Sequence, residues 1–165
     1  MAAGKTTVGR ILAARLRWEF LDFDEAIVER AGRTPGEIIR QDGESAFRAV
    51  EAALTAELAG RGGVVLAPGG GWGGDPAVVA SLGEGTVRVW LRISPEEAVR
   101  RADRDATDRP LLGAGPGRLE RAAALLRERE DRYGRADMVV DVQGREPERV
   151  ADEIVRRLEA HSGGR

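Results

Sequence analysis

The stretch AAGKTTVGRILAARL, residues 2–16, determines how the rest of this chain is interpreted. A phosphate-binding loop has the pattern G-x-x-x-x-G-K-[ST] and leads into a helix, and its backbone N–H groups point inward at phosphates. Gly4, Lys5 and Thr6 match the end of this pattern, and apolar residues then recur at the spacing of one helical face. The predicted nucleotide-phosphate site consists of Ala2, Ala3, Gly4, Lys5, Thr6 and Thr7.

Lys5 is the only lysine in the chain, whereas arginine occurs 25 times. An ammonium is a compact charge on a slim stem, and a guanidinium is a wide planar fork. A loop that wraps tightly around a phosphate needs the slim group. Because the only lysine of the chain stands at this position, we favour a phosphate site. The alternative is an ordinary helix start with a capping threonine.

The composition excludes several classes of protein. The 165 residues suit one compact domain, which we place at residues 1–160 with a short tail at 161–165. The absence of cysteine excludes a disulfide framework, a zinc–thiolate site and a thiol nucleophile. The 28 acidic residues against 26 basic ones argue against an electrostatic nucleic-acid binder, and the apolar stretches are too short to span a membrane. We expect a cytoplasmic protein, since the N-terminus lacks a signal pattern.

Strands and helices are expected to alternate along the chain. The expected strands are 19–24, 64–67, 86–93 and 138–140. The expected helices are 5–18, 24–31, 44–59, 119–135 and 146–160. Further helix starts are expected at 34–37, 75–76 and 94–97, with Thr34, Asp75 and Ser94 as the capping residues. The segment 103–117 is rich in Asp, Gly, Pro and Arg and is typical of a loop. Strands separated by helices predict an α/β fold whose parallel sheet is covered by helices on both faces.

Two acidic residues and a glycine run follow the first two predicted strands. Asp22 and Asp24 lie at the carboxyl end of the first strand, where carboxylates near a phosphate loop suit Mg²⁺ binding and a hydroxyl acceptor. The alternative is a turn residue and a helix cap. Gly69-Gly70-Gly71 follows the second strand, and its backbone can approach a ligand closely and donate N–H groups. The alternative there is a flexible turn.

Three arginines stand in settings that suggest recognition of an anion. These are Arg48 within FRAVE, Arg109 within RPLL, and Arg129 four residues before Tyr133. A guanidinium binds carboxylate or phosphate through two parallel hydrogen bonds. With 25 arginines in the chain, however, pairing with glutamates on the same helix or exposure to solvent would explain most of them. Composition does not separate functional from surface arginines.

The order of the motifs is more specific than any one of them. GKTTVGRILAARL, FLDFDEAI, GESAFRAVE, APGGG, VWLRISPEEAVRR and DRPLL follow one another, and the chain continues with LLRER, a tyrosine and an Ala-Asp pair. This order, from Ala2 to about Leu158, resembles the shikimate kinase family. The resemblance implies a P-loop NTPase-type parallel sheet of five strands, of which four are visible here, with the first strand central and a lid loop at about 103–117. It also implies transfer of the γ-phosphoryl of ATP to the 3-hydroxyl of shikimate, on the route to chorismate and the aromatic amino acids.

The resemblance assigns roles toward the nucleotide and the metal. Lys5 matches the phosphate-loop lysine, and Thr6 matches the hydroxyl that binds Mg²⁺. Asp22 matches an acidic residue near the metal, usually linked to it through water, and Arg109 matches the lid arginine that closes on the phosphates. The positions around the adenine are matched by Arg101, Arg145 and Pro147. The resemblance therefore implies one Mg²⁺ per subunit, ATP as co-substrate and a monomer.

The resemblance also assigns roles toward the acceptor. Asp24 matches the carboxylate that holds shikimate hydroxyls and is the candidate base. Arg48 and Arg129 match the pair that binds the shikimate carboxylate, and Gly70 matches a backbone donor to a hydroxyl. Lys5, Asp24 and Arg109 are the residues expected to act on the transferring group.

The chain departs from the family pattern at its start. The leading glycine of the loop and the first strand would precede Met1, so we expect the natural protein to begin upstream. One alternative is a kinase-like domain that is inactive because these parts are missing. Another is a related small-molecule kinase of the gluconate type, although Glu25-Ala26-Ile27 stands where such kinases carry His-Pro. Trp72, directly after the glycines, is bulkier than the residue usual in the shikimate kinase family.

Overall fold

The computed structural model describes residues 2–72, 76–104 and 116–162, in which helices alternate with short strands. In chain order the elements are α1 (Lys5–Leu16), β1 (Glu19–Asp22), α2 (Phe23–Ala31), α3 (Pro35–Asp42), α4 (Glu44–Glu57), β2 (Val64–Ala67), α5 (Pro76–Ala80), β3 (Val89–Arg92), α6 (Pro95–Arg104), α7 (Arg118–Tyr133), β4 (Met138–Asp141) and α8 (Pro147–Ser162). Each of the strands and helices expected from the sequence is present.

Some boundaries differ from the predicted ones for local reasons. The first strand ends at Asp22 because its carboxylate accepts a hydrogen bond from the backbone N–H of Asp24 (2.9 Å) and so caps α2. The third strand is shorter than predicted, because the N–H of Thr86 donates to the carbonyl of Gly83 (3.2 Å) in a turn. Helix α6 continues to Arg104, into the predicted loop.

The helix starts that capping residues predicted are confirmed. Thr34 Oγ1 accepts from the backbone N–H of Glu37 (3.2 Å), and the Glu37 carboxylate accepts from the N–H of Thr34 (2.7 Å). Ser94 Oγ accepts from the N–H of Glu97 (3.2 Å) in the same way at the start of α6. Asp75, the expected cap of α5, lies outside the described residues.

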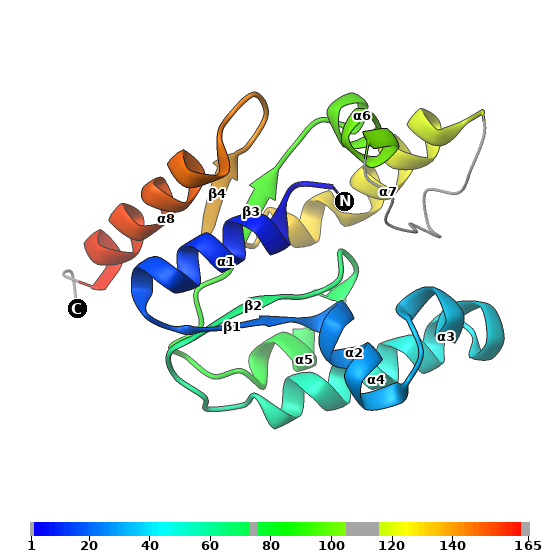
Figure 1. The fold of residues 1–165 in the computed structure, drawn as a ribbon, viewed down its shortest axis with the longest axis horizontal. Coiled ribbons are helices and arrows are strands. Elements are labelled where there is room, and N and C mark those ends of the chain that lie inside the picture. Colours follow the sequence, from blue (N-terminus) through cyan, green and yellow to red (C-terminus); the bar gives the residue numbers. More distant parts are fainter. Residues whose placement is uncertain (1, 73–75, 105–115, 163–165) are drawn as a thin grey trace.

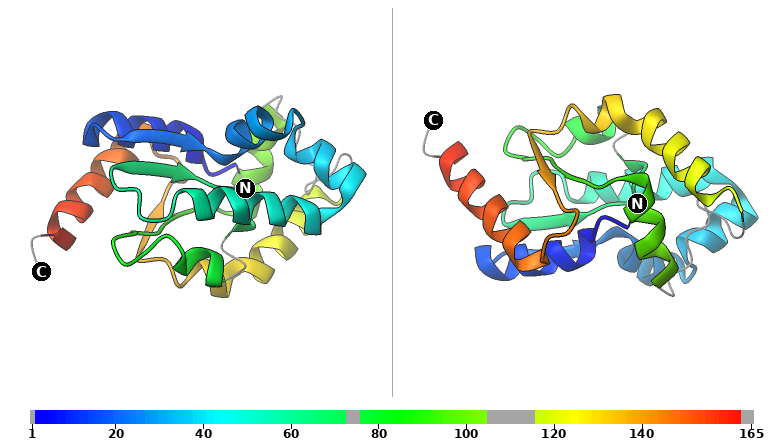
Figure 2. Two further views of the ribbon diagram at one scale, coloured as in Figure 1. Left: turned by 90° about the horizontal axis from the view of Figure 1, so that it is seen from below. Right: turned by 90° about the horizontal axis from the view of Figure 1, so that it is seen from above.

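The four strands in the described segments form two separate parallel pairs, β1 with β2 and β3 with β4 (Figure 1). Helices α1 and α7 lie on opposite sides of the β3–β4 pair, and α8 packs along α1 (Figure 2). The β1–β2 pair lies between α1 and the layer formed by α4 and α5 (Figure 1). The predicted α/β fold, with parallel strands covered by helices, is confirmed.

A cavity of about 650 Å³ lies between the two strand pairs. Val65 of β2 and Leu91 of β3 line it, together with Val8 and Leu12 of α1. Within the described segments β2 pairs only with β1, and β3 pairs only with β4. The edge of β2 opposite β1 and the edge of β3 opposite β4 are therefore unpaired in these segments.

The apolar side chains form two cores. The first joins α1, α6, α7 and α8 to β4, and Ala151 and Ile154 are almost fully buried in it. The second joins α2, α3 and α4 through Phe23, Ile27 and Phe47. Within the described segments, every helix is too short or too polar to cross a lipid bilayer.

Candidate active site

The loop that precedes α1 depends on one glycine. Gly4 is the N-cap of α1 and has a φ of +83°, a left-handed conformation that other residues adopt only with strain. Its carbonyl accepts from the N–H of Val8 (2.9 Å), and it has no side chain that could cap the first amides of the helix. These amides and the Lys5 ammonium give the start of α1 a positive potential suited to an anion.

Thr6 and Asp22, the residues predicted to bind the metal, lie together. Thr6 Oγ1 donates to Asp22 Oδ2 (2.6 Å), while Oδ1 of the same carboxylate caps α2. Asp22 can therefore act as a helix cap and still present an oxygen to the loop. A hydroxyl and a buried carboxylate are hard oxygen donors, which fit Mg²⁺. Among the side chains of residues 2–72, 76–104 and 116–160, no three acidic groups gather around one point, so a Mg²⁺ ion held by Thr6 and Asp22 would take its remaining ligands from phosphate and water.

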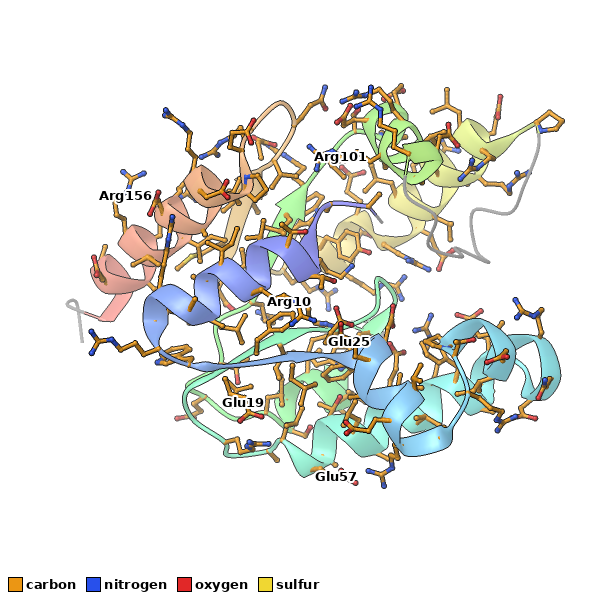
Figure 3. The ribbon with its side chains drawn as sticks, in the orientation of Figure 1. Arg10, Glu19, Glu25, Glu57, Arg101 and Arg156 are labelled. Carbon is orange, nitrogen blue, oxygen red and sulfur yellow. The ribbon has the colours of Figure 1, made fainter. Side chains whose placement is uncertain are left out.

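An ion pair joins α1, which carries Thr6, to α2, which Asp22 caps. Arg10 of α1 and Glu25 of α2 approach within 2.6 Å (Figure 3). Both side chains are mostly exposed, so the pair contributes less than about 1 kcal/mol. Together with the bond between Thr6 and Asp22, it holds the start of α2 against α1.

The triple-glycine turn (Gly69–Gly71) lies against three charged side chains. A Cβ on its first glycine would lie 2.6 Å from Glu51 Oε1, and one on its second would lie 3.1 Å from a guanidinium nitrogen of Arg129. A Cβ on its third glycine would overlap the guanidinium of Arg48. A side chain at any of these three positions would displace one of the charged groups, and the two arginines predicted to bind one carboxylate meet at this turn.

Arg48 is held by two glutamates of its own helix, α4. It donates to Glu51 and to Glu44, the latter at 2.7 Å, and its guanidinium carbon lies 5.0 Å from the centre of the Phe47 ring. Glu51 is only 2% exposed, and this burial raises its pKa, even though Arg48 opposes the rise. The charge of Asp24 raises the pKa of Glu51 further, so Asp24 lies within electrostatic reach of the same cluster.

Arg129 reaches the turn from α7, far along the sequence. It is 4% exposed, and its Nε has no hydrogen-bond partner among the described residues. Tyr133, one helical turn later, donates through its hydroxyl to the carbonyl of Gly70, and its ring lies 5.5 Å from that of Trp90. A buried guanidinium with an unused donor is costly unless an anion accompanies it. The position of Arg129 is thus suited to an anionic ligand.

A second cavity, of about 240 Å³, adjoins the loop before α1. Its lining includes Ala2, Ala3, Gly4, Thr7, Arg101, Arg145 and Pro147. Arg101, seen near α6 in Figure 3, donates to the carbonyl of Val142 (3.0 Å), and Arg145 donates to that of Asp141 (3.0 Å). Both arginines are therefore anchored at the carboxyl end of β4, and the residues predicted to surround the adenine gather beside the loop.

Two residues near the site were not predicted from the sequence, and one predicted residue lies outside the described part of the chain. Arg109, the predicted lid arginine, lies outside the described residues, as does most of the predicted lid. Glu51 was not predicted, although its position three residues after Arg48 on a helix is the signal that could have identified it. No sequence signal marks Thr55, whose hydroxyl accepts a hydrogen bond from the indole N–H of Trp72.

The geometry of the loop defines the class of protein. A lysine–threonine loop that opens a helix, with an acidic residue at the end of a neighbouring parallel strand, is the arrangement of P-loop phosphotransferases. The family model described as "Shikimate kinase" matches residues 1–159. The chain belongs to the shikimate kinase family.

Individual relatives agree with this assignment. The chain is 45% identical over 161 residues to the shikimate kinase of Moorella thermoacetica, an alignment that covers 97% of this chain and 91% of that protein. It is 45% identical over 159 residues to that of Mycobacterium avium, covering 96% and 89%. The solved structure of the Acinetobacter baumannii shikimate kinase in complex with shikimate has a TM-score of 0.90 at 33% identity, covering 98% of this chain and 89% of that chain. For the Aquifex aeolicus enzyme the TM-score is 0.80 at 30% identity, with 100% and 95% covered.

Proposed function

We propose that this chain transfers the γ-phosphoryl group of ATP to the 3-hydroxyl of shikimate, a step toward the aromatic amino acids. The observation that carries the proposal is the meeting of Arg48 and Arg129 at the triple-glycine turn. Two guanidinium groups from separate helices can bind the two oxygens of one carboxylate. Membership of the shikimate kinase family supports this choice of acceptor, and the Acinetobacter baumannii relative is a complex with shikimate.

The loop before α1 would bind the phosphates of ATP. The amides of residues 2–7 and the ammonium of Lys5 would surround the β- and γ-phosphates, with the adenine in the cavity lined by Arg101 and Arg145. Thr6 and Asp22 would hold a Mg²⁺ ion, which when bound neutralises charge on the phosphate oxygens. Arg109 remains a prediction from the sequence.

The acceptor would lie between α2, α4 and the triple-glycine turn. Its carboxylate would bind Arg48 and Arg129, and the N–H of Gly70 would donate to one of its hydroxyls. Asp24 would accept the proton of the 3-hydroxyl while that oxygen forms a bond to the γ-phosphorus. The bond from the γ-phosphorus to the bridging oxygen breaks at the same time, and ADP leaves with that oxygen. We further propose that the protein acts as a monomer in the cytoplasm.

A second candidate function is a kinase-like domain that binds the acceptor without phosphorylating it. The observation that favours it is the cavity of about 650 Å³ beside α1. A cavity of this size gives the start of α1 fewer packing contacts than a filled core would, so the phosphate loop is held less firmly. A loop that is held less firmly would lower the rate of phosphoryl transfer more than the affinity for the acceptor, because transfer requires precise alignment of the reacting atoms.

A coupled ADP-release assay tests the proposal. We expect ADP release that requires ATP, Mg²⁺ and shikimate together. Shikimate methyl ester has the same hydroxyls but no charge for the two arginines, and it should be a worse acceptor by about 100-fold or more. Calorimetry with shikimate separates the two candidates, because binding without turnover identifies the inactive domain. Faster turnover with gluconate than with shikimate, or no binding of shikimate at all, would overturn the proposal.

A further inference from the structure

A buried chain of hydrogen bonds connects the triple-glycine turn to α4. The indole Nε1–H of Trp72 donates to Thr55 Oγ1 (2.7 Å), and the Thr55 hydroxyl donates onward to the carbonyl oxygen of Glu51 (2.7 Å). Thr55 is fully buried, so its hydroxyl is used as acceptor and as donor entirely within the protein. The chain ends at the residue whose carboxylate holds Arg48.

Trp72 also contacts the segment that carries the two site aspartates. Its ring lies edge to face against Phe23, with centroids 6.2 Å apart and an interplanar angle of 80°. Phe23 is fully buried and stands between Asp22 and Asp24 in the chain. The backbone N–H of Trp72 donates to the carbonyl of Gly69 (3.1 Å) and closes the turn. One residue thus connects the turn, the start of α2 and α4.

The turn needs such an anchor because of its composition. Three consecutive glycines lose more backbone entropy on ordering than other residues do, so the turn has little conformational preference of its own. Tyr133 holds the carbonyl of Gly70 from the side of α7. Trp72 holds the end of the turn from the side of α4. Without the second anchor, the turn could shift relative to Arg48 while remaining bound to α7.

We infer that Trp72 and Thr55 are positioning residues for the acceptor site. Their hydrogen bond sets the position of the Gly70 N–H relative to the guanidinium of Arg48. The inference rests on the proposed function, in which those two groups bind the same acceptor. It assigns the role to the indole N–H and not to the bulk of the ring. A tryptophan that only filled the core would act through its ring, so the two roles can be separated by substitution.

Three variants isolate the hydrogen bond. Trp72→Phe keeps an aromatic ring against Phe23 and removes the N–H, whereas Thr55→Val keeps the shape of Thr55 and removes the hydroxyl. Each should raise KM for shikimate by about 3- to 10-fold, the effect of one buried hydrogen bond. The KM for ATP and kcat at saturating shikimate should not change. The double variant should show the same rise as either single one, because both substitutions remove one interaction.

Two controls accompany these variants. Thr55→Ser retains a hydroxyl and should restore KM for shikimate to the value of the unmodified protein. Trp18→Phe makes the same substitution at a tryptophan that is 44% exposed and should change nothing. Equal rises in the KM values of ATP and shikimate, additive effects in the double variant, or no restoration by serine would overturn the inference and assign Trp72 to packing alone.

Hydrogen exchange keeps the inference testable if the protein does not turn over. The amides of residues 69–72 should exchange faster in Trp72→Phe and Thr55→Val than in Trp18→Phe, whether or not ADP is released. Unchanged exchange at residues 69–72 would overturn the inference. If exchange rises as expected but the unmodified protein binds no shikimate, the proposed function fails while the anchor remains.

Discussion

Glu51 and Glu97 are two nearly covered glutamates that pair with arginines of their own helix, yet their pKa values move in opposite directions. Burial raises the pKa of Glu51, with Arg48 opposing. Hydrogen bonds from Arg100 and Arg101 lower the pKa of Glu97 from 4.5 to about 2. Both pairs have the short spacing of a helical surface pair, so spacing does not explain the difference.

The surroundings of the two carboxylates explain it. Glu51 lies beneath the triple-glycine turn with one arginine partner and with the charges of Asp24 and Glu44 nearby. Glu97 is covered largely by its own arginines, which remain 53% and 29% exposed to water, and it lies in the first turn of α6, where the helix dipole favours an anion. The Glu97 region is therefore satisfied internally. The Glu51 region, together with the unused donor of Arg129, is incomplete without a ligand.

The largest difference between the two regions is expected in activity. Arg48→Ala should lower kcat/KM for shikimate by about 10²- to 10³-fold, because it removes a charged partner of the acceptor carboxylate. Arg100→Ala removes the arginine at the matching spacing from Glu97 and should leave kcat/KM unchanged. Steady-state kinetics with shikimate varied at saturating ATP provides the measurement. An equal loss in both variants would show that the two regions do not differ in function.

Stability should separate a buried acid from an exposed one on the same helix. Glu51→Ala should lower the free energy of unfolding by about 2–3 kcal/mol, since it leaves the partly buried Arg48 without its inner partner. Glu44→Ala removes the outer partner, which is 55% exposed, and should cost less than about 1 kcal/mol. Urea unfolding at neutral pH measures both. Similar losses for the two variants would contradict the difference in burial.

The opposite pKa directions predict opposite dependences of stability on pH. The folded protein binds the Glu51 proton more tightly than the unfolded chain, so this group's contribution to stability falls as pH rises from about 4.5 through the raised pKa. The folded protein binds the Glu97 proton less tightly, so that contribution is present above about 4.5 and is lost as pH falls toward about 2.

Glutamine variants test these two windows by urea unfolding across pH. Subtracting the profile of Glu51→Gln from that of the unmodified protein should reveal a slope only above pH 4.5. The same subtraction for Glu97→Gln should reveal a slope only between pH 4.5 and about 2. Slopes in the same window for both variants would remove the distinction between the regions.

The smallest effect is expected from a third type of pair, across two strands. Arg92 of β3 and Asp141 of β4 are register partners, joined at 2.6 Å, and both side chains are more than half exposed. Arg92→Ala should change the free energy of unfolding by less than about 1 kcal/mol, and 0.5 M NaCl should reduce the difference further. A loss of unfolding free energy as large as that of Glu51→Ala would show that the exposure of an ion pair does not predict its contribution to stability in this protein.

Local sequence signals predicted most of the fold. The capping residues Thr34 and Ser94 mark helix starts that the structure contains, because a cap is satisfied by amides two or three positions away. The alternation expected through Asp24 was wrong for the same local reason, since the Asp22 carboxylate caps α2 and ends the strand.

The candidate site was predicted less completely. The family resemblance implied that Thr6 and Asp22 lie at one metal site and that Arg48 and Arg129 lie at one carboxylate, and the structure brings each pair together. The sequence did not predict that Arg129 is buried or that Thr55 receives the N–H of Trp72. These facts depend on contacts between helices, which leave no periodic mark in a single sequence.

The sequence alone therefore specified the elements and the phosphate loop, because each depends on groups that are close together along the chain. The order of the motifs along the whole chain indicated the class of chemistry. Packing of distant segments selected the few arginines, among 25, that lie against the triple-glycine turn. Tertiary packing also determined whether the pKa of each carboxylate is raised, as in Glu51, or lowered, as in Glu97. Burial and the number of nearby charges set the free energy of an ionised group, and both exist only after α4, α7 and the turn have come together.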